Sequence, residues 1–147
     1  MMNILAILLL IAVNVESQVE HCTCTMLHGL ISVYVNFNRQ VFPTIEWEPI
    51  LSTKAKEELT DPGKHTRHSL AFVSGWSLVP SGDSIYNQVR KVLRTRFIRK
   101  LNKLSRHRPS KFGCNGVLQD FGKHQKNLTI GCLYRLTVYD TNSEQDN

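Results

Sequence analysis

An apolar run at the amino terminus constrains this chain most, because it decides the compartment and with it the chemistry of the cysteines. Residues 4–13 (ILAILLLIAV) are apolar without interruption. A bilayer core needs about twenty such residues, so a run of about ten is typical of a signal peptide. Val15 and Ser17 supply small residues three and one before a cut. We therefore expect residues 1–17 to be a signal peptide and the mature chain to begin at Gln18.

The remaining sequence predicts a single secreted, soluble domain. No later stretch approaches the eighteen uncharged apolar residues that a transmembrane helix needs, so no membrane anchor is expected. The length fits one domain. We assign residues 18–140 to this domain and residues 141–147 to a flexible tail.

The four cysteines predict two disulfides in an oxidising compartment. Cys22 and Cys24 are two residues apart, and a bridge between such close neighbours in an extended chain fits disulfide geometry poorly. We therefore expect each of them to pair with Cys114 or Cys132, in either combination. Such bridges would tie the start of the mature chain to its last third and stabilise the fold by a few kcal/mol.

Metal binding is the alternative reading of the segment HCTCTMLH, residues 21–28. His21, Cys22, Cys24 and His28 are all zinc-ligand types. Their Cys-x-Cys spacing is tighter than that of usual zinc sites, and secreted thiol pairs are normally oxidised. Disulfides are thus preferred, with the two histidines as surface residues.

Hydrophobic periodicity predicts an α+β, β-rich fold. Alternating or β-branched apolar residues favour strands over residues 30–37, 69–79 and 128–138. Gly75 is expected to form a bulge or a kink, and Cys132 to lie on an apolar face. A short helix is expected over residues 52–59, and turns at 61–63 and at Asn115-Gly116. Asn127-Leu128-Thr129 is a glycosylation sequon with Asn127 facing outward.

A basic amphipathic helix is predicted over residues 85–104, where apolar residues recur at threes and fours after a possible cap at Asp83 or Ser84. The net charge of the chain is +6, from 18 basic and 12 acidic residues. Residues 85–111 hold ten of the basic residues and no acid, so the rest of the chain carries 8 − 12 = −4. The ten are Arg90, Lys91, Arg94, Arg96, Arg99, Lys100, Lys103, Arg106, Arg108 and Lys111.

This charge predicts a binding function and not catalysis. Like charges four apart on a helix repel, so ten cations without an acid exceed what solubility needs. Extracellular polyanions that would attract them are sulfated glycosaminoglycans and anionic membranes. No hydrolase, zinc-protease or phosphate-loop motif is present, and nothing orders the six histidines into a ribonuclease-type pair. We expect no enzyme activity, no cofactor, no metal and no nucleic-acid partner.

Three short motifs resemble the netrin-like module of the tissue inhibitors of metalloproteinases. Cys22-Thr23-Cys24 is similar to the Cys-x-Cys that opens those chains. The run from Ser110 to Leu118 (SKFGCNGVL), followed by Gly122-Lys123, looks like their Cys-Gly-Val-x-Leu and Gly-Lys run. Residues 84–92 resemble their Tyr-x-Val-x-x-Val strand.

The resemblance implies a five-stranded OB-type barrel with disulfide-linked first cysteines, and inhibition of a metalloproteinase. Cys22 would chelate the protease zinc, Thr23 would enter its S1′ pocket, and Cys24 would be the second disulfide partner. A mature start at Cys22, in place of Gln18, would free the α-amine that such chelation needs.

Two functions follow as hypotheses. The first is a secreted netrin-like inhibitor or a protein that binds extracellular matrix or glycosaminoglycan. The alternative is a cationic host-defence or signalling protein that acts through its basic helix.

Overall fold

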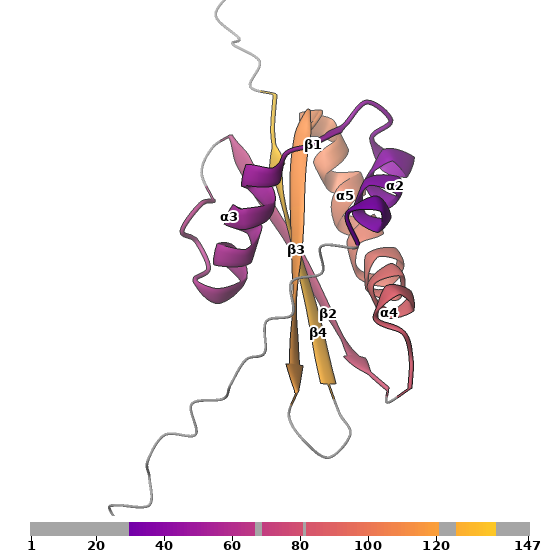
Figure 1. Cartoon of the computed structure of the whole chain (residues 1–147). Coiled ribbons are helices and arrows are strands. Elements are labelled where there is room, and N and C mark those ends of the chain that lie inside the picture. Colours follow the sequence, from indigo (N-terminus) through magenta and orange to yellow (C-terminus); the bar gives the residue numbers. More distant parts are fainter. Residues whose placement is uncertain (1–29, 67–68, 81, 121–125, 138–147) are drawn as a thin grey trace, which may run out of the picture.

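A four-stranded sheet lies between helices in the computed structural model (Figure 1), which describes residues 30–66, 69–80, 82–120 and 126–137. The strands are β1 (Glu46–Trp47), β2 (Leu70–Val79), β3 (Lys111–Asp120) and β4 (Lys126–Arg135). Their order in the sheet is β1-β3-β4-β2, with β1 parallel to β3 and the other pairs antiparallel. The sheet is open, so β2 forms one edge along its full length.

Helices cover both faces of this sheet. Helix α3 (Pro49–Thr60) packs on one face. Helix α2 (Ile31–Val41) and a longer helical segment cover the other face (Figure 1). The longer segment consists of α4 (Ile85–Val92), the π-helical turn η2 (Leu93–Phe97) and α5 (Ile98–Leu104), followed by the 3₁₀ turn η3 (Ser105–His107).

The main core fills the space between the sheet and the α2 and α4–η2–α5 layer. Phe97, Phe112, Ile130 and Tyr134 are fully buried there. A smaller core lies under α3, where Leu51 and Ala55 pack against Leu133 of β4. Both faces of β4 are therefore buried over residues 130–134, as expected of a strand inside a three-layer fold.

Several predicted elements are confirmed. The helix over residues 85–104 is present, and the Ser84 hydroxyl accepts a hydrogen bond from the Asn87 amide as its N-cap. The short helix over residues 52–59 is the body of α3, which begins earlier because Pro49 fits the first helical position. The strands over residues 69–79 and 128–138 are β2 and β4.

Other predictions are wrong. Residues 30–37 form a helix, because Leu30, Val33, Tyr34 and Phe37 also fit a helical period and bury one face against the sheet. There is no bulge at Gly75, since β2 pairs with β4 without interruption.

Asn115-Gly116 is no turn but lies in the middle of β3. Its Asn115 side chain is satisfied locally, since Oδ1 accepts from the Gly116 amide at 2.9 Å. This side chain therefore does not need a turn to find a partner. The sheet is also open where the netrin-like resemblance implied a closed barrel.

Some predictions cannot be compared with the fold. The signal peptide over residues 1–17, the alternative mature starts at Gln18 and Cys22, and the tail over residues 141–147 lie outside the described residues. The segment HCTCTMLH, with its inhibitory residues Cys22, Thr23 and Cys24, lies outside them too.

Candidate functional site

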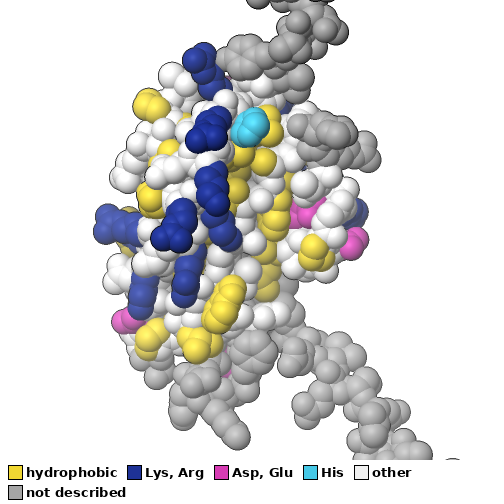
Figure 2. All heavy atoms as spheres, turned by 180° about the vertical axis from the view of Figure 1, so that it is seen from behind, with side chains coloured by type: hydrophobic (Ala, Val, Ile, Leu, Met, Phe, Trp, Pro, Cys, Tyr) yellow, Lys and Arg dark blue, Asp and Glu magenta, His cyan; other side chains and the backbone are white. Residues whose placement is uncertain are grey.

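The cations of the α4–η2–α5 segment and its following 3₁₀ turn form one exposed surface, called the basic face below. The opposite side of the segment is apolar and fully buried at Val89, Leu93, Phe97 and Leu101, which anchors it to the sheet. Figure 2 shows Lys and Arg side chains gathered in a column, with hydrophobic side chains exposed beside them. The basic face consists of Arg90, Lys91, Arg94, Arg96, Arg99, Lys100, Lys103 and Arg106, all exposed.

The two remaining residues of the predicted cluster follow the 3₁₀ turn in the sequence. Arg108 follows the 3₁₀ turn with a left-handed backbone (φ 39°), and its carbonyl accepts a hydrogen bond from the Thr137 hydroxyl. Lys111 opens β3, opposite Arg135 of β4. Eight of the ten predicted polyanion-binding residues thus lie on the helical segment and its 3₁₀ turn.

The charge of the basic face is not neutralised by neighbours within the described residues. The salt bridges within the described residues involve other side chains. They join Glu57 to Lys64 and His65, Asp120 to Lys126, and Glu48 to Arg135. None of the eight cations takes part in a salt bridge with a described acidic side chain. The face is therefore a region of uncompensated positive charge, which attracts anions and their polymers.

Close packing at Gly75 sets how the basic face meets the sheet. A Cβ atom at Gly75 would lie 2.6 Å from the Cβ of Arg96, so glycine lets the π-helical turn contact β2 directly. π-Helical turns occur often at functional sites. Lys100, one turn further on, donates from Nζ to the Ser74 carbonyl at 2.5 Å. The basic face is thus attached to β2, the outer strand of the described sheet.

A groove of about 590 Å³ lies where the basic face meets this edge. Arg96, Arg99 and Lys100 line it from the helical segment, and Trp76 lines it from β2 with 56% of its surface exposed. The rest of the lining is Ser74, Gly75, Thr95 and Thr129. It combines three cations, three hydroxyl groups and one aromatic ring.

A second, smaller hollow of about 340 Å³ lies nearer the start of the segment. Asn87, Arg90, Lys91, Arg94 and Thr95 line it. The Arg90 guanidinium lies 5.6 Å from the centre of the Tyr86 ring, a cation–π contact that orients its charge. Cations are therefore available along the whole segment.

The observed disulfide corrects the predicted pairing. Cys114 and Cys132 are directly paired residues of β3 and β4 and are bonded to each other, so neither is available to Cys22 or Cys24. The prediction excluded a Cys22–Cys24 bridge and so gave each of these cysteines a late partner, whereas the β3–β4 hairpin places Cys114 and Cys132 side by side. Cys132 does lie on the apolar face, as predicted.

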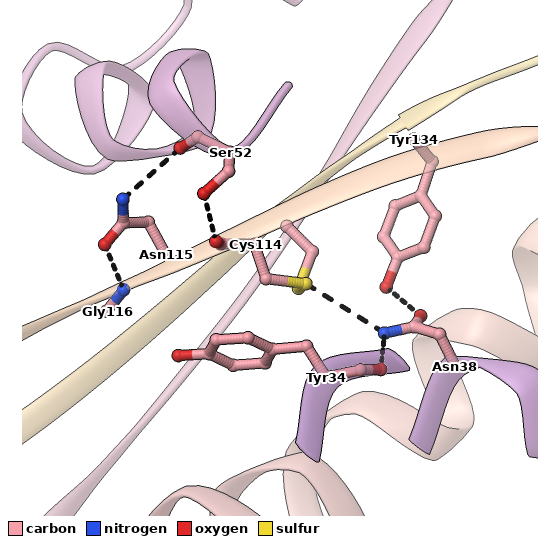
Figure 3. Close-up of a disulfide and its surroundings, with 8 residues drawn as sticks. Tyr34, Asn38, Ser52, Cys114, Asn115, Gly116 and Tyr134 are labelled. Carbon is pink, nitrogen blue, oxygen red and sulfur yellow. Dashed lines mark hydrogen bonds between the residues drawn. A yellow bond between two sulfur atoms is a disulfide. The ribbon is translucent and has the colours of Figure 1, made fainter. Parts of the chain in front are cut away.

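A polar network next to this disulfide was not foreseen from the sequence (Figure 3). Asn38 of α2 is fully buried; its Oδ1 accepts from the Tyr134 hydroxyl at 2.7 Å and its Nδ2 donates to the Tyr34 carbonyl at 2.9 Å. Burial raises the pKa of Tyr134, and the hydrogen bond to Asn38 opposes this in part. These residues are locked into the core and offer no reactive group.

The described part of the chain holds no group of three or more His, Cys, Asp or Glu side chains that could bind a metal ion. The carboxylate with the most perturbed surroundings is Glu57. Hydrogen bonds from Lys64 and His65 lower the pKa of Glu57 to about 2. That carboxylate belongs to an exposed ion-pair cluster at the end of α3. His21 and His28 lie outside the described residues.

The sequon residue Asn127 lies inside β4, between Gln119 of β3 and Leu78 of β2. Its side chain is half-buried, and its Oδ1 is enclosed without a hydrogen-bond partner among the described residues. Glycosylation of Asn127 stays a prediction.

The sequence matches a family model described as "15 kDa excretory/secretory protein" over residues 33–136. The chain belongs to this family. Its members are excretory/secretory proteins, and the protein is secreted, as the leader predicts. No curated protein matches the sequence. In the described residues, no helix is both long enough and apolar enough to span a membrane.

Two solved structures of an Ancylostoma-secreted protein, Ac-ASP-7, are similar to this excretory/secretory chain. The manganese-bound form is 20% identical with a TM-score of 0.51, over 74% of this chain and 66% of that one. The other is 18% identical with a TM-score of 0.48, over 67% and 54%. The chain thus spans about half to two thirds of their length, and the likeness concerns the fold alone.

The netrin-like resemblance is wrong. The matching family is the excretory/secretory one, and the sheet is open. Residues 84–92, which resembled a strand of the netrin-like module, form the start of helix α4. That motif therefore lies on a different element here, whereas Cys22-Thr23-Cys24 and Gly122-Lys123 lie outside the described residues.

Proposed function

We propose that this secreted protein binds sulfated polysaccharides of the extracellular space through its basic face. The observation that supports the proposal is the row of eight exposed cations without a described acidic partner. The segment from Ile85 to Leu104 is about 30 Å long at 1.5 Å per residue. Such a row matches a linear polymer that carries charge along its whole length.

The alternative, a membrane-active cationic helix, is less favoured. An amphipathic helix inserts its apolar side between lipids. Here that side is fully buried at Val89, Leu93 and Phe97, so the helix would have to leave the core. If the isolated peptide of residues 85–111 and the folded protein both permeabilise anionic vesicles, this alternative gains support. A folded protein that leaves vesicles intact favours polysaccharide binding.

The test of polysaccharide binding uses two variants with the same charge change. Arg99→Gln/Lys103→Gln removes two cations from the basic face, whereas Lys54→Gln/Lys56→Gln removes two from α3 on the opposite side of the sheet. Each exposed ion pair is worth up to about 1 kcal/mol, so the first variant should bind heparin roughly 3- to 30-fold more weakly. The second should bind nearly as the natural protein does.

Salt dependence provides a second readout. Binding of a polyanion releases counterions, so the affinity falls with salt in proportion to the number of ion contacts. The basic-face variant should show a smaller slope of log affinity against log salt concentration. Equal losses in both variants would mean that bulk charge alone drives binding, which would contradict the proposal.

A further inference from the structure

The groove beside the basic face has an aromatic wall that charge attraction alone does not require. Trp76 lies on β2, opposite Thr129 of β4, and both line the groove. The main core buries large aromatic rings such as Phe97 and Phe112, but more than half of the Trp76 surface is exposed. An exposed ring next to three cations suggests a ligand with both an apolar surface and negative charge.

The fold positions two of the three cations of this groove. Lys100 is fixed by its hydrogen bond to the Ser74 carbonyl, and Arg96 packs over Gly75. Arg99 lines the same groove. Arginine side chains bind oxyanions through two N–H donors at once, and lysine acts as a point charge.

Hydroxyl groups complete the lining. Ser74, Thr95 and Thr129 are small polar residues that can donate to or accept from a sugar hydroxyl. A pyranose ring has apolar C–H groups on one side, which pack against aromatic rings, and polar groups around its rim. The groove thus presents a matching partner for each part of a sulfated sugar.

We infer that this groove is a subsite for one sulfated sugar unit of the bound polymer. Trp76 packs against the apolar side of the sugar ring, while Arg96, Arg99 and Lys100 bind its sulfate groups. The inference rests on the proposed function and goes further by giving it selectivity for sulfated sugars over other polyanions.

The shape of the site favours a sugar over a lipid surface. Residues that insert into membranes project from the protein, whereas Trp76 forms the wall of a hollow with polar residues around it. Leu78 provides the matched control. It is 52% exposed and lies two residues further along β2, on the same side of the strand, but does not line the groove.

The experiment compares Trp76→Ala with Leu78→Ala in the full chain. Binding of size-defined heparin oligosaccharides and of inorganic polyphosphate is measured at several salt concentrations, after circular dichroism shows that both variants are folded. Trp76→Ala should bind the oligosaccharides about five- to tenfold more weakly, because one ring contact is lost, with an unchanged salt slope. It should bind polyphosphate as the natural protein does, and Leu78→Ala should be unchanged for both.

Three results would overturn the inference. Trp76→Ala could match Leu78→Ala with oligosaccharides, or it could lose affinity for polyphosphate as much as for the sugar. Both variants could also lose binding to phosphatidylserine vesicles while oligosaccharide binding is intact, which would assign the patch to a lipid surface. Failure of the polysaccharide proposal is seen separately, in the Arg99→Gln/Lys103→Gln comparison.

Discussion

Asn38 shows how much a single buried side chain can organise in this fold. Its side chain points from α2 toward the sheet (Figure 3). There its Oδ1 accepts from the Tyr134 hydroxyl, and its Nδ2 lies 3.9 Å from the Cys114 sulfur. Tyr34, one turn before it, is also buried, but its hydroxyl has no partner among the described residues. The two tyrosines therefore differ in what their hydroxyl groups contribute.

This difference predicts opposite outcomes for the same substitution. Tyr134→Phe leaves the buried Asn38 Oδ1 without its donor, which should lower the free energy of unfolding by about 1–3 kcal/mol. Tyr34→Phe removes a hydroxyl that has no described partner and should be neutral or slightly stabilising. Urea unfolding of both variants measures this. Equal losses would show that the hydroxyl of Tyr34 finds a partner in solution.

Two glycines, Gly113 and Gly75, leave different amounts of space for an added methyl group, so their substitution by alanine should destabilise the fold to different degrees. A Cβ at Gly113 would lie 2.1 Å from the Ser52 backbone nitrogen, which cannot move without shifting α3. At Gly75 the nearest atoms are the Cβ of Arg96, at 2.6 Å, and a ring carbon of the buried Phe97, at 3.2 Å, so the clash is less severe. Overpacking of a core costs about 1–3 kcal/mol or more, so Gly113→Ala should destabilise the fold more than Gly75→Ala. The contrary order in urea unfolding would mean that α3 shifts more easily than the π-helical turn.

At the scale of elements, secondary structure could be predicted from the sequence where the apolar residues of a segment fit only one periodicity. The apolar residues over 85–104 fit a helix alone, and that helix is present. Residues 30–37 fit both periods, and burial of the Val33, Tyr34 and Phe37 side against the sheet decided for a helix. Such a decision depends on tertiary packing, which the local pattern does not contain.

The end of α3 gives a prediction about pH. Glu58 is buried and accepts from the amides of Gly63, His65 and Thr66, at 2.7 Å for Gly63 and 2.8 Å for Thr66. Burial raises the pKa of Glu58, but these amide donors outweigh it, so the pKa lies below its ordinary value of 4.5. The folded state thus binds fewer protons than the unfolded state in acid. Its stabilisation is fully present above about pH 4.5 and is lost as the pH falls.

Glu58→Gln should therefore be less stable at pH 7 and lose less stability between pH 7 and pH 3 than the natural protein. Urea unfolding at the two pH values measures both effects. Glu46→Gln, at an exposed carboxylate of β1, is the control and should keep the natural pH dependence. If Glu58→Gln keeps it too, the amide contacts do not persist in solution.

At the scale of the whole molecule, the candidate site comes from elements that are distant in the sequence. The cations were predicted because they are concentrated in one stretch of sequence, residues 85–111, whereas the groove also needs Trp76 of β2 and Thr129 of β4. No local pattern relates these strands to the helix. Their proximity follows from the strand order, which places β2 at the edge beneath the helical segment.

The disulfide connectivity is the strongest test of this whole arrangement. Both cysteines pair across the β3–β4 hairpin, which closes a loop of 18 residues. Trypsin should release the segments 112–123 and 127–135 joined by one disulfide, because Lys111, Lys123, Lys126 and Arg135 bound them. Mass spectrometry before and after reduction identifies this pair, and a larger mass of the second segment would reveal a glycan at Asn127.

The long-range alternative predicts different masses, since Cys22 and Cys24 lie before Arg39, the first tryptic site of the chain. Linkage of 112–123 or 127–135 to that amino-terminal segment would contradict the hairpin disulfide. Removing the bridge with Cys114→Ala/Cys132→Ala should cost about 3 kcal/mol of unfolding free energy, the entropy of closing a loop of this length. Because β3 and β4 lie at the centre of the sheet, that loss should appear as one cooperative shift of the whole unfolding transition.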